Sequence, residues 1–277
     1  MPSGRSLHIG LNRVNPNAYE GWAGQLAGCE NDARDMQAIA RKQKLAPKSL
    51  LTRAATSSAV TAAIADAAAT LVPGDLFFLS YSGHGSQVPD TNGDETEDRM
   101  DETWVLYDRE LVDDELYALW GTFQTGVRIF VLSDSCHSGT ATKAALFGRR
   151  GSPAALGLES AARAKMMPRH IQDATYAAHQ KLYDKIQKGL PSGSRVSIGA
   201  SVVLISGCQD NQTSADGAKN GLFTEKLLKV WKGGKFKGSL RQFHREIVKQ
   251  MPPAQTPNYF RTGAPSASFE RKKPFTL

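Results

Sequence analysis

Two short apolar runs, each followed by small polar residues, constrain the fold of this chain more than any other feature. The first run, Leu76–Leu79, leads into the glycines and serines around His84, and the second, Ile129–Leu132, leads into those around Cys136. Apolar runs without alternation are typical of strands covered on both faces of a parallel sheet. Because the carboxyl ends of neighbouring parallel strands meet at one edge, we expect His84 and Cys136 to lie close together.

A thiol beside an imidazole is a nucleophile with its base. Taken singly, a cysteine after a strand is more simply a small buried hydrophobe, and a lone histidine is more simply a core or surface residue. The pair favours catalysis because both residues follow the same kind of strand and lie among glycines and serines, which let a substrate backbone approach closely. The separation of 52 residues also matches caspases, whose histidine lies about 50 residues before the cysteine.

The two motifs are similar to those of metacaspases, the caspase-like peptidases of bacteria, plants, fungi and protists. They are Ser-Gly-His-Gly at 82–85 and Asp-Ser-Cys-His-Ser-Gly at 134–139, and segments 204–216 and 255–257 also resemble the family. The Gln-Ala-Cys form of animal caspases is absent. The resemblance implies an α/β caspase-like three-layer sandwich, with a mostly parallel central sheet and helices on both faces. It also suggests a bacterial source, because the chain starts at the first strand without a proline-rich prodomain.

Alternation of strands with helices leads to the same fold class. Strands are expected at 6–11, 48–53, 75–80, 103–107, 128–133 and 201–206, with a terminal strand or hairpin within 256–270. Helices are expected at 28–42 (capped by Asn31 or Asp32), 57–71 (capped by Ser57 or Ser58), 112–122, 158–167, 171–188, 221–231 and 240–251. We expect one domain over 1–277, with a large-subunit-like part (1–147), a linker (148–198) and a small-subunit-like part (199–277).

Composition excludes several classes of protein. The chain has neither the apolar stretch of a signal peptide nor one long enough for a membrane span. Its three cysteines, Cys29, Cys136 and Cys208, are widely spaced and odd in number, which argues against a disulfide framework or a zinc site. Dinucleotide-binding and Walker signatures are absent. We therefore expect a cytoplasmic protein with no membrane partner and no cofactor required for its chemistry.

Charge is divided unequally along the chain. Residues 1–140 carry a net charge of −8 and residues 141–277 a net charge of +15. A basic half is compatible with nucleic-acid binding, but the basic residues are dispersed and lack interleaved aromatic residues. We favour a solvated basic face, and we expect no nucleic-acid partner. An acidic half packed on a basic half of one domain is equally compatible with this distribution.

The resemblance assigns roles to several residues around the dyad. It implies catalysis by His84 and Cys136, oxyanion donors at the backbone N–H groups of Gly85 and Cys136, and cleavage after Arg or Lys. The residues that match the family's specificity pocket are Cys29, Asp32, Ser82 and Asp134. Two carboxylates suit a guanidinium, which they can bind with paired charge-assisted hydrogen bonds. Asp32 could instead be a helix N-terminal carboxylate, and Cys29 simply a small helix residue. We treat His137 as structural.

An acidic stretch follows the histidine strand. Residues 90–115 contain 12 carboxylates, and clustered carboxylate oxygens are the ligands that calcium prefers. Asp101, Asp113 and Asp114 match ligands of calcium-activated metacaspases, whereas Lys143 replaces the family's fourth carboxylate. Calcium as an activator is therefore open, and the alternative is helix capping by Asp113 and Asp114 beside a solvated loop.

Peptide substrates and self-processing occur together in the metacaspases. Five basic residues of the linker would be exposed if the linker is a loop, and we take them as candidate sites of self-cleavage: Arg149, Arg150, Arg163, Lys165 and Lys188. The resemblance also implies a monomer that acts on proteins or peptides. The alternatives are a catalytically silent scaffold on the same fold and a related peptidase of different specificity.

Overall fold

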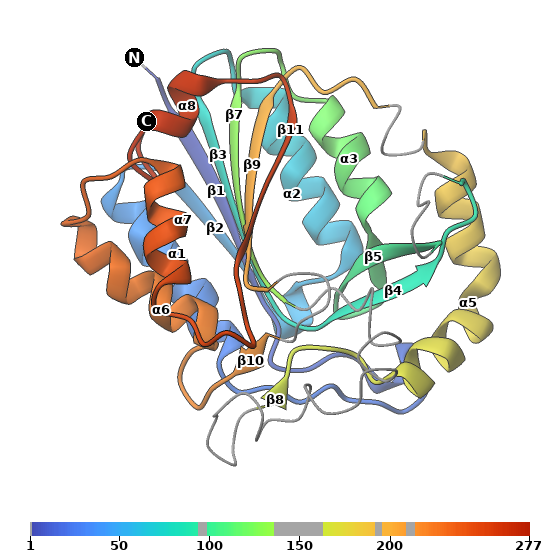
Figure 1. Ribbon diagram of the computed structural model, residues 1–277. Coiled ribbons are helices and arrows are strands. Elements are labelled where there is room, and N and C mark those ends of the chain that lie inside the picture. The colour runs from blue at the N-terminus through green and yellow to red at the C-terminus, as the bar shows by residue number, and fades with distance from the viewer. Residues whose placement is uncertain (1, 94–98, 136–162, 192–195, 209–213) are drawn as a thin grey trace.

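The centre of the molecule is a twisted six-stranded sheet (Figure 1). The structure is a computed structural model and describes residues 2–93, 99–135, 163–191, 196–208 and 214–277. The strands of the sheet are, in spatial order, β11 (Asn258–Gly263), β9 (Ser201–Ser206), β7 (Arg128–Asp134), β3 (Leu76–Ser82), β1 (Gly4–Gly10) and β2 (Ala46–Leu51). All neighbours are parallel except β11, which pairs antiparallel with β9.

Helices cover both faces of this sheet, so the predicted three-layer α/β architecture is confirmed. On one face lie α2 (Ser57–Thr70) and α3 (Asp113–Gly121), and on the other lie α1 (Cys29–Lys42), α6 (Leu222–Trp231), α7 (Leu240–Val248) and α8 (Ala267–Arg271). The two layers enclose two hydrophobic clusters, because β3 and β7 direct alternate side chains to opposite faces. Phe77 and Ile129 belong to the first cluster, and Phe78 and Phe130 to the second.

Two smaller sheets lie beside the carboxyl edge of the central sheet. One has the strand order β4 (Gly85–Pro89), β5 (Met100–Val105) and β6 (Glu110–Val112), and β4 contacts the long helix α5 (Arg169–Gly189). The other pairs β8 (Arg163–Ala164) antiparallel with β10 (Ala215–Asp216). The figure shows β8 and β10 at one end of the molecule, below the ends of β3 and β7 (Figure 1).

The expected strands and most of the expected helices are confirmed, with corrections at their ends. Helix α1 begins after Gly28 and has no side-chain cap, so the predicted caps are wrong; α2 is capped by Thr56, whose hydroxyl accepts the Ala59 N–H at 3.2 Å. Residues 163 and 164 form a strand rather than part of a helix over 158–167, whose earlier residues lie outside the described ranges. The short strands β4, β6, β8 and β10 were not predicted.

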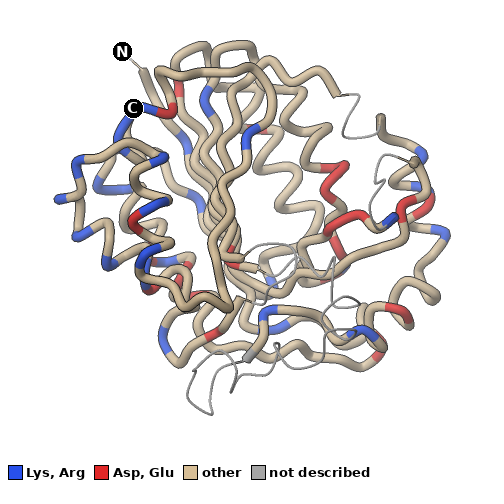
Figure 2. Tube along the Cα trace, in the orientation of Figure 1, with Lys and Arg blue, Asp and Glu red and all other residues tan. Residues whose placement is uncertain are grey.

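The charge asymmetry of the sequence persists in three dimensions. Basic residues are frequent over the layer of α1, α6 and α7, whereas acidic residues gather around β5, β6 and the start of α3 (Figure 2). Strand β9, from the basic half, pairs directly with β7, from the acidic half. Among the residues that the structure describes, no helix combines the length and apolar content needed to cross a bilayer.

Candidate active site

The carboxyl ends of β3 and β7 carry two predicted pocket residues side by side. Ser82 and Asp134 are paired in the register of the two strands, and both are buried. Asp32, in the first turns of α1, completes the group: the Ser82 hydroxyl donates to Asp32 Oδ2 at 2.7 Å. Cys29, the first residue of α1, is fully buried, and its burial raises the pKa of the thiol. The structure therefore brings all four predicted pocket residues to one edge of the sheet.

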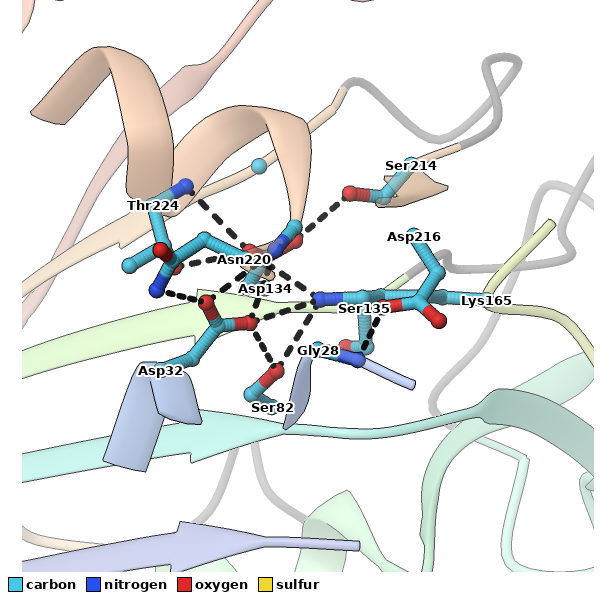
Figure 3. A network of polar contacts seen from close by, with 12 residues as sticks. Gly28, Asp32, Ser82, Asp134, Ser135, Lys165, Ser214, Asp216, Asn220 and Thr224 are labelled. Carbon is cyan, nitrogen blue, oxygen red and sulfur yellow. Dashed lines mark hydrogen bonds and ion pairs between the residues drawn. The ribbon is translucent and has the colours of Figure 1, made fainter. Parts of the chain in front are cut away.

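A lysine from the linker occupies the space between these side chains (Figure 3). Lys165 Nζ lies 3.1 Å from Asp32 Oδ2, 3.1 Å from Asp134 Oδ2 and 2.9 Å from Ser82 Oγ. The ammonium donates hydrogen bonds to Asp32 Oδ2 and Ser82 Oγ and forms an ion pair with Asp134 Oδ2. The side chain is 0% exposed, so the expectation that Lys165 would be exposed is wrong. The three oxygen atoms form a closed site for a primary ammonium.

Electrostatics stabilises the charged form of this lysine. Burial alone would lower the pKa of Lys165, but the carboxylates of Asp134 and Asp32 raise it well above its ordinary value. Burial raises the pKa of Asp32, and the Lys165 ammonium opposes that shift. A buried charge is tolerated only when it is paired and hydrogen-bonded, and both conditions hold at this site.

The second half of the chain fixes the two carboxylates (Figure 3). Asp134 accepts hydrogen bonds from Ser214 Oγ at 2.7 Å and from Thr224 Oγ1 at 2.8 Å. Asp32 accepts hydrogen bonds from Asn220 Nδ2 at 2.9 Å and from the Gly221 N–H at 3.1 Å. The donors come from the residues before α6 and from its first turn, where N–H groups without helical partners favour negative charge. The pocket is thus assembled from both halves of the sequence.

His84 follows β3 and is also buried. Its Nε2 lies 3.0 Å from the Gly24 carbonyl oxygen, and since a carbonyl can only accept, Nε2 carries the proton. Its Nδ1 has no hydrogen-bond partner within the described ranges and is left as the basic nitrogen. The Trp22 ring lies 4.7 Å from the imidazole between centroids. Burial lowers the pKa of His84 to about 4, so the ring is neutral at pH 7.

The extended backbone around Lys165 forms main-chain hydrogen bonds with Ser214 on one side and with Gly85 on the other. Its N–H donates to the Ser214 carbonyl at 2.9 Å, which continues the pairing of β8 with β10. Its carbonyl oxygen accepts the Gly85 N–H at 3.0 Å, and the Met167 N–H donates to the Gly85 carbonyl at 3.0 Å. A peptide recognised as an added strand is held in the same way, by main-chain hydrogen bonds together with a pocket for a side chain. Gly85, the predicted oxyanion donor, therefore contacts the carbonyl of the lysine in the pocket.

The remaining predicted residues fall outside the described ranges or belong to the predicted calcium site. Cys136, His137, Lys143, Arg149 and Arg150 lie outside the described residues. The three predicted calcium ligands lie on β5 (Asp101) and in the first turn of α3 (Asp113 and Asp114), and the Asn92 amide donates to Asp114. Within the described ranges, no three His, Cys, Asp or Glu side chains lie close enough to hold a metal ion. Calcium binding at these three carboxylates therefore stays a prediction.

Sequence reasoning missed the residues that support the predicted ones. These are Trp22, Gly24, Ser214, Asn220, Gly221, Thr224 and Gln255. Most form contacts over more than forty positions of sequence, which no local pattern shows. One signal was present: the expected helix at 221–231 opens on a glycine with no capping side chain, and such a helix start can bind a carboxylate from elsewhere.

Comparison with known proteins relates the whole chain to one family. Residues 14–269 match the family model described as the caspase domain, Peptidase C14. Metacaspase-1 of Mycosarcoma maydis is 30% identical over 250 residues, covering 79% of this chain and 59% of that protein. Metacaspase-1 of Saccharomyces cerevisiae strain YJM789 is 31% identical over 260 residues, covering 78% of this chain and 55% of that protein. The chain thus spans little more than half the length of these curated relatives.

Solved structures show the same fold. A crystal structure of a Geobacter sulfurreducens protein is 51% identical to this chain, with a TM-score of 0.89 and 99% of each chain covered. Caspase-1 from Spodoptera frugiperda shares only 9% identity, yet it superposes with a TM-score of 0.52 over 95% of this chain and 86% of its own. At that identity the second likeness shows the fold alone.

Proposed function

The chain belongs to the caspase family of cysteine peptidases, with metacaspases among its relatives, and from this premise we propose that it is an endopeptidase that cleaves after lysine or arginine through Cys136 and His84. One observation carries the proposal: the chain's own Lys165 lies with its ammonium between Asp32 and Asp134 and its carbonyl on the Gly85 N–H. A peptide that binds in the same way presents a basic side chain to the pocket and its next peptide bond to the dyad.

The chemistry divides between the two catalytic residues. The Cys136 thiolate attacks the carbonyl carbon of the basic residue, and His84 holds the thiol proton. As the C–N bond breaks, that proton passes to the leaving amine, and a water then hydrolyses the thioester. The Gly24 carbonyl orients the imidazole and holds the proton on Nε2, so Nδ1 is the nitrogen that can act as the base. The Gly85 N–H supplies a preorganised donor for the oxyanion.

Two features support lysine and arginine over other side chains. The pocket presents two buried carboxylates, which would repel an acidic side chain and would remain unpaired opposite an apolar one. Their four oxygens can accept a planar guanidinium as well as an ammonium. Substrates with aspartate at this position, the residue before the cleaved bond (P1), are expected to bind poorly.

The same geometry supports self-processing at one bond. Among the candidate basic residues, Lys165 lies in the pocket, whereas Lys188 is exposed on α5. The bond from Lys165 to Met166 follows directly after the carbonyl that accepts the Gly85 N–H. We therefore assign self-cleavage to the Lys165–Met166 bond. In the uncut chain, Lys165 occupies the pocket and competes with other substrates for it.

Activation by calcium is a separate proposal, and it rests on the match of Asp101, Asp113 and Asp114 to the family's ligands. Asp101 and Asp114 are buried carboxylates within an acidic region. When bound, calcium would supply positive charge to these carboxylates. A rise in the melting temperature of Cys136→Ala in calcium, absent in magnesium or chelator, supports binding, and an unchanged melting temperature argues against it.

Paired fluorogenic peptides that differ only at P1 test the proposed function. Wild-type protein and Cys136→Ala are compared on peptides ending in lysine, arginine or aspartate, each with calcium and with chelator. Turnover after lysine and arginine that vanishes in Cys136→Ala supports both the nucleophile and the pocket. Turnover after aspartate overturns the pocket assignment, and no turnover of any peptide by the wild-type protein, with or without calcium, favours the silent scaffold.

A further inference from the structure

Gly221 forms the wall of the cation site opposite the sheet. It precedes the first residue of α6, and its N–H donates to both carboxylate oxygens of Asp32, at 3.1 and 3.2 Å. Its backbone angles, φ −61° and ψ 149°, are open to any L-residue. The conformation of the chain therefore does not require glycine at this position.

The space around Gly221, in contrast, does require a glycine. A β-carbon built on Gly221 would contact Lys165 Nζ more closely than van der Waals radii allow. It would also lie 2.5 Å from Asp134 Oδ2 and 3.1 Å from Asp32 Oδ2. These neighbours are the ammonium and the two carboxylates that bind it. The atoms that exclude a side chain here are therefore those of the occupied pocket.

Neither the Asp134 carboxylate nor helix α6, which carries Gly221 at its start, can easily move away from this contact. The Asp134 carboxylate is held by Ser214 and by both the N–H and the hydroxyl of Thr224. Helix α6 is anchored by Phe223 and Leu227, which are 1% exposed in the hydrophobic cluster beneath α1, α6 and α7. A methyl group on Gly221 would consequently displace the ammonium, the neighbour that it meets most closely, and would also press on the Asp134 carboxylate.

We propose that Gly221 is a specificity-determining residue whose missing side chain gives the pocket the depth of a lysine. The proposal rests on the function proposed above. A methyl group would shorten the pocket by about 1.5 Å, the length of a carbon–carbon bond, which is close to one methylene of the substrate. Gly221→Ala should therefore disfavour lysine relative to ornithine, which carries the same ammonium on a side chain one methylene shorter.

The test compares kcat/KM for peptides with lysine or ornithine at P1. For Gly221→Ala we expect lysine cleavage to fall about 100-fold, with a much smaller loss for ornithine, since one methylene in a fitted pocket changes discrimination by about 10–200-fold. Gly189→Ala is the matched control, because a β-carbon there meets nothing within 4 Å, and it should leave both values unchanged. Unchanged lysine cleavage by Gly221→Ala, or equal losses for both peptides, overturns the proposal.

A second measurement does not depend on catalysis. In the Cys136→Ala background, melting temperatures are compared for Gly221→Ala, Lys165→Ala and the double variant. Lys165→Ala removes the ammonium that the new methyl group would meet. The fall in melting temperature of the double variant should therefore be smaller than the sum of the falls in the two single variants. Additive losses overturn the role of Gly221 even if the peptidase function holds, and coupling without any peptide turnover contradicts only the peptidase function.

Discussion

The Lys165 ammonium is buried, and its charge is compensated by two carboxylates and a hydroxyl at hydrogen-bond or ion-pair distance. Moving an ion out of water costs several kcal/mol, and this cost is offset when geometry and hydrogen bonds are good. Here Asp32, Asp134 and Ser82 provide that geometry. A substrate lysine entering the same site would find acceptors already held in place, which lowers the entropic cost of binding.

Replacing one carboxylate should therefore weaken the recognition of lysine substantially. We expect Asp134→Asn to lower kcat/KM for a lysine peptide about 100-fold or more, because truncating one partner of a buried charge pair costs roughly 2–5 kcal/mol. Asp35→Asn is the matched control: Asp35 also accepts from Asn220 Nδ2, at 2.9 Å, but it does not bind the ammonium. Equal losses in the two variants would mean that general disturbance of the network, rather than the pocket charge, sets the rate.

The residues of the proposed pocket could be predicted from sequence better than the residues that hold them in place. Cys29, Asp32, Ser82 and Asp134 were identified through family motifs, and the structure brings them together. The Asp134 partners Ser214 and Thr224 lie 80 and 90 positions along the chain. The position of Lys165 was also missed, because its burial depends on tertiary pairing with β10 rather than on any local pattern.

Helix α5 holds the segment that contains Lys165. Two buried glutamines anchor the helix to β4: Gln172 Nε2 donates to the Gln87 carbonyl, and Gln187 Nε2 donates to the Pro89 carbonyl at 3.0 Å. Pro89 is the last residue of β4, the strand that begins at Gly85. The same small sheet therefore positions both Gly85, the proposed oxyanion donor, and the segment that follows Lys165.

Removing the anchors should loosen that segment. In the Cys136→Ala background, we expect Gln172→Ala with Gln187→Ala to speed hydrogen exchange at the Lys165 and Met167 amides about 10-fold or more, since each substitution removes a side-chain hydrogen bond between α5 and β4, worth about 0.5–1.5 kcal/mol. Gln180→Ala, at an exposed position of α5, should have no such effect. Unchanged exchange in the double variant would show that α5 does not hold the segment.

Long elements were predictable and short ones were not. The apolar runs of β3, β7 and β9 and the helical spacing of α1 carry strong local signals. The residues of β4, Gly-Ser-Gln-Val-Pro, contain a glycine and a proline, which usually argue against a strand, and β8 and β10 are two residues each. Such strands exist only because neighbouring segments supply their hydrogen bonds.

The stability of the whole molecule should depend on two buried histidines. Burial lowers the pKa of His84 to about 4 and that of His8 to about 3. Because the folded pKa values lie below the unfolded value of about 6.5, the unfolded state binds protons first as the pH falls. Their contribution to stability is therefore present above about pH 6.5 and is lost as the pH falls toward 4 and 3.

Melting temperatures between pH 7 and pH 4 check this linkage. The difference between the folded and unfolded pKa values of His84 corresponds to about 3 kcal/mol of unfolding free energy, which is lost in full once the pH lies below both values. In the Cys136→Ala background, His84→Asn should lose less stability than its parent over this interval. Carboxylate titration affects both proteins alike, so identical pH profiles would contradict a buried, neutral His84.

The most direct test of the account is the N-terminal sequence of the fragments that the active protein produces. Wild-type protein and Cys136→Ala are incubated with and without calcium, and the products are also weighed intact. The account predicts a new N-terminus at Met166 in the wild-type protein and an uncut chain in Cys136→Ala. A wild-type chain that stays whole under both conditions, or that is cut after Arg149, Arg150 or Lys188 instead, would contradict the assignment of Lys165 as the substrate residue in the pocket.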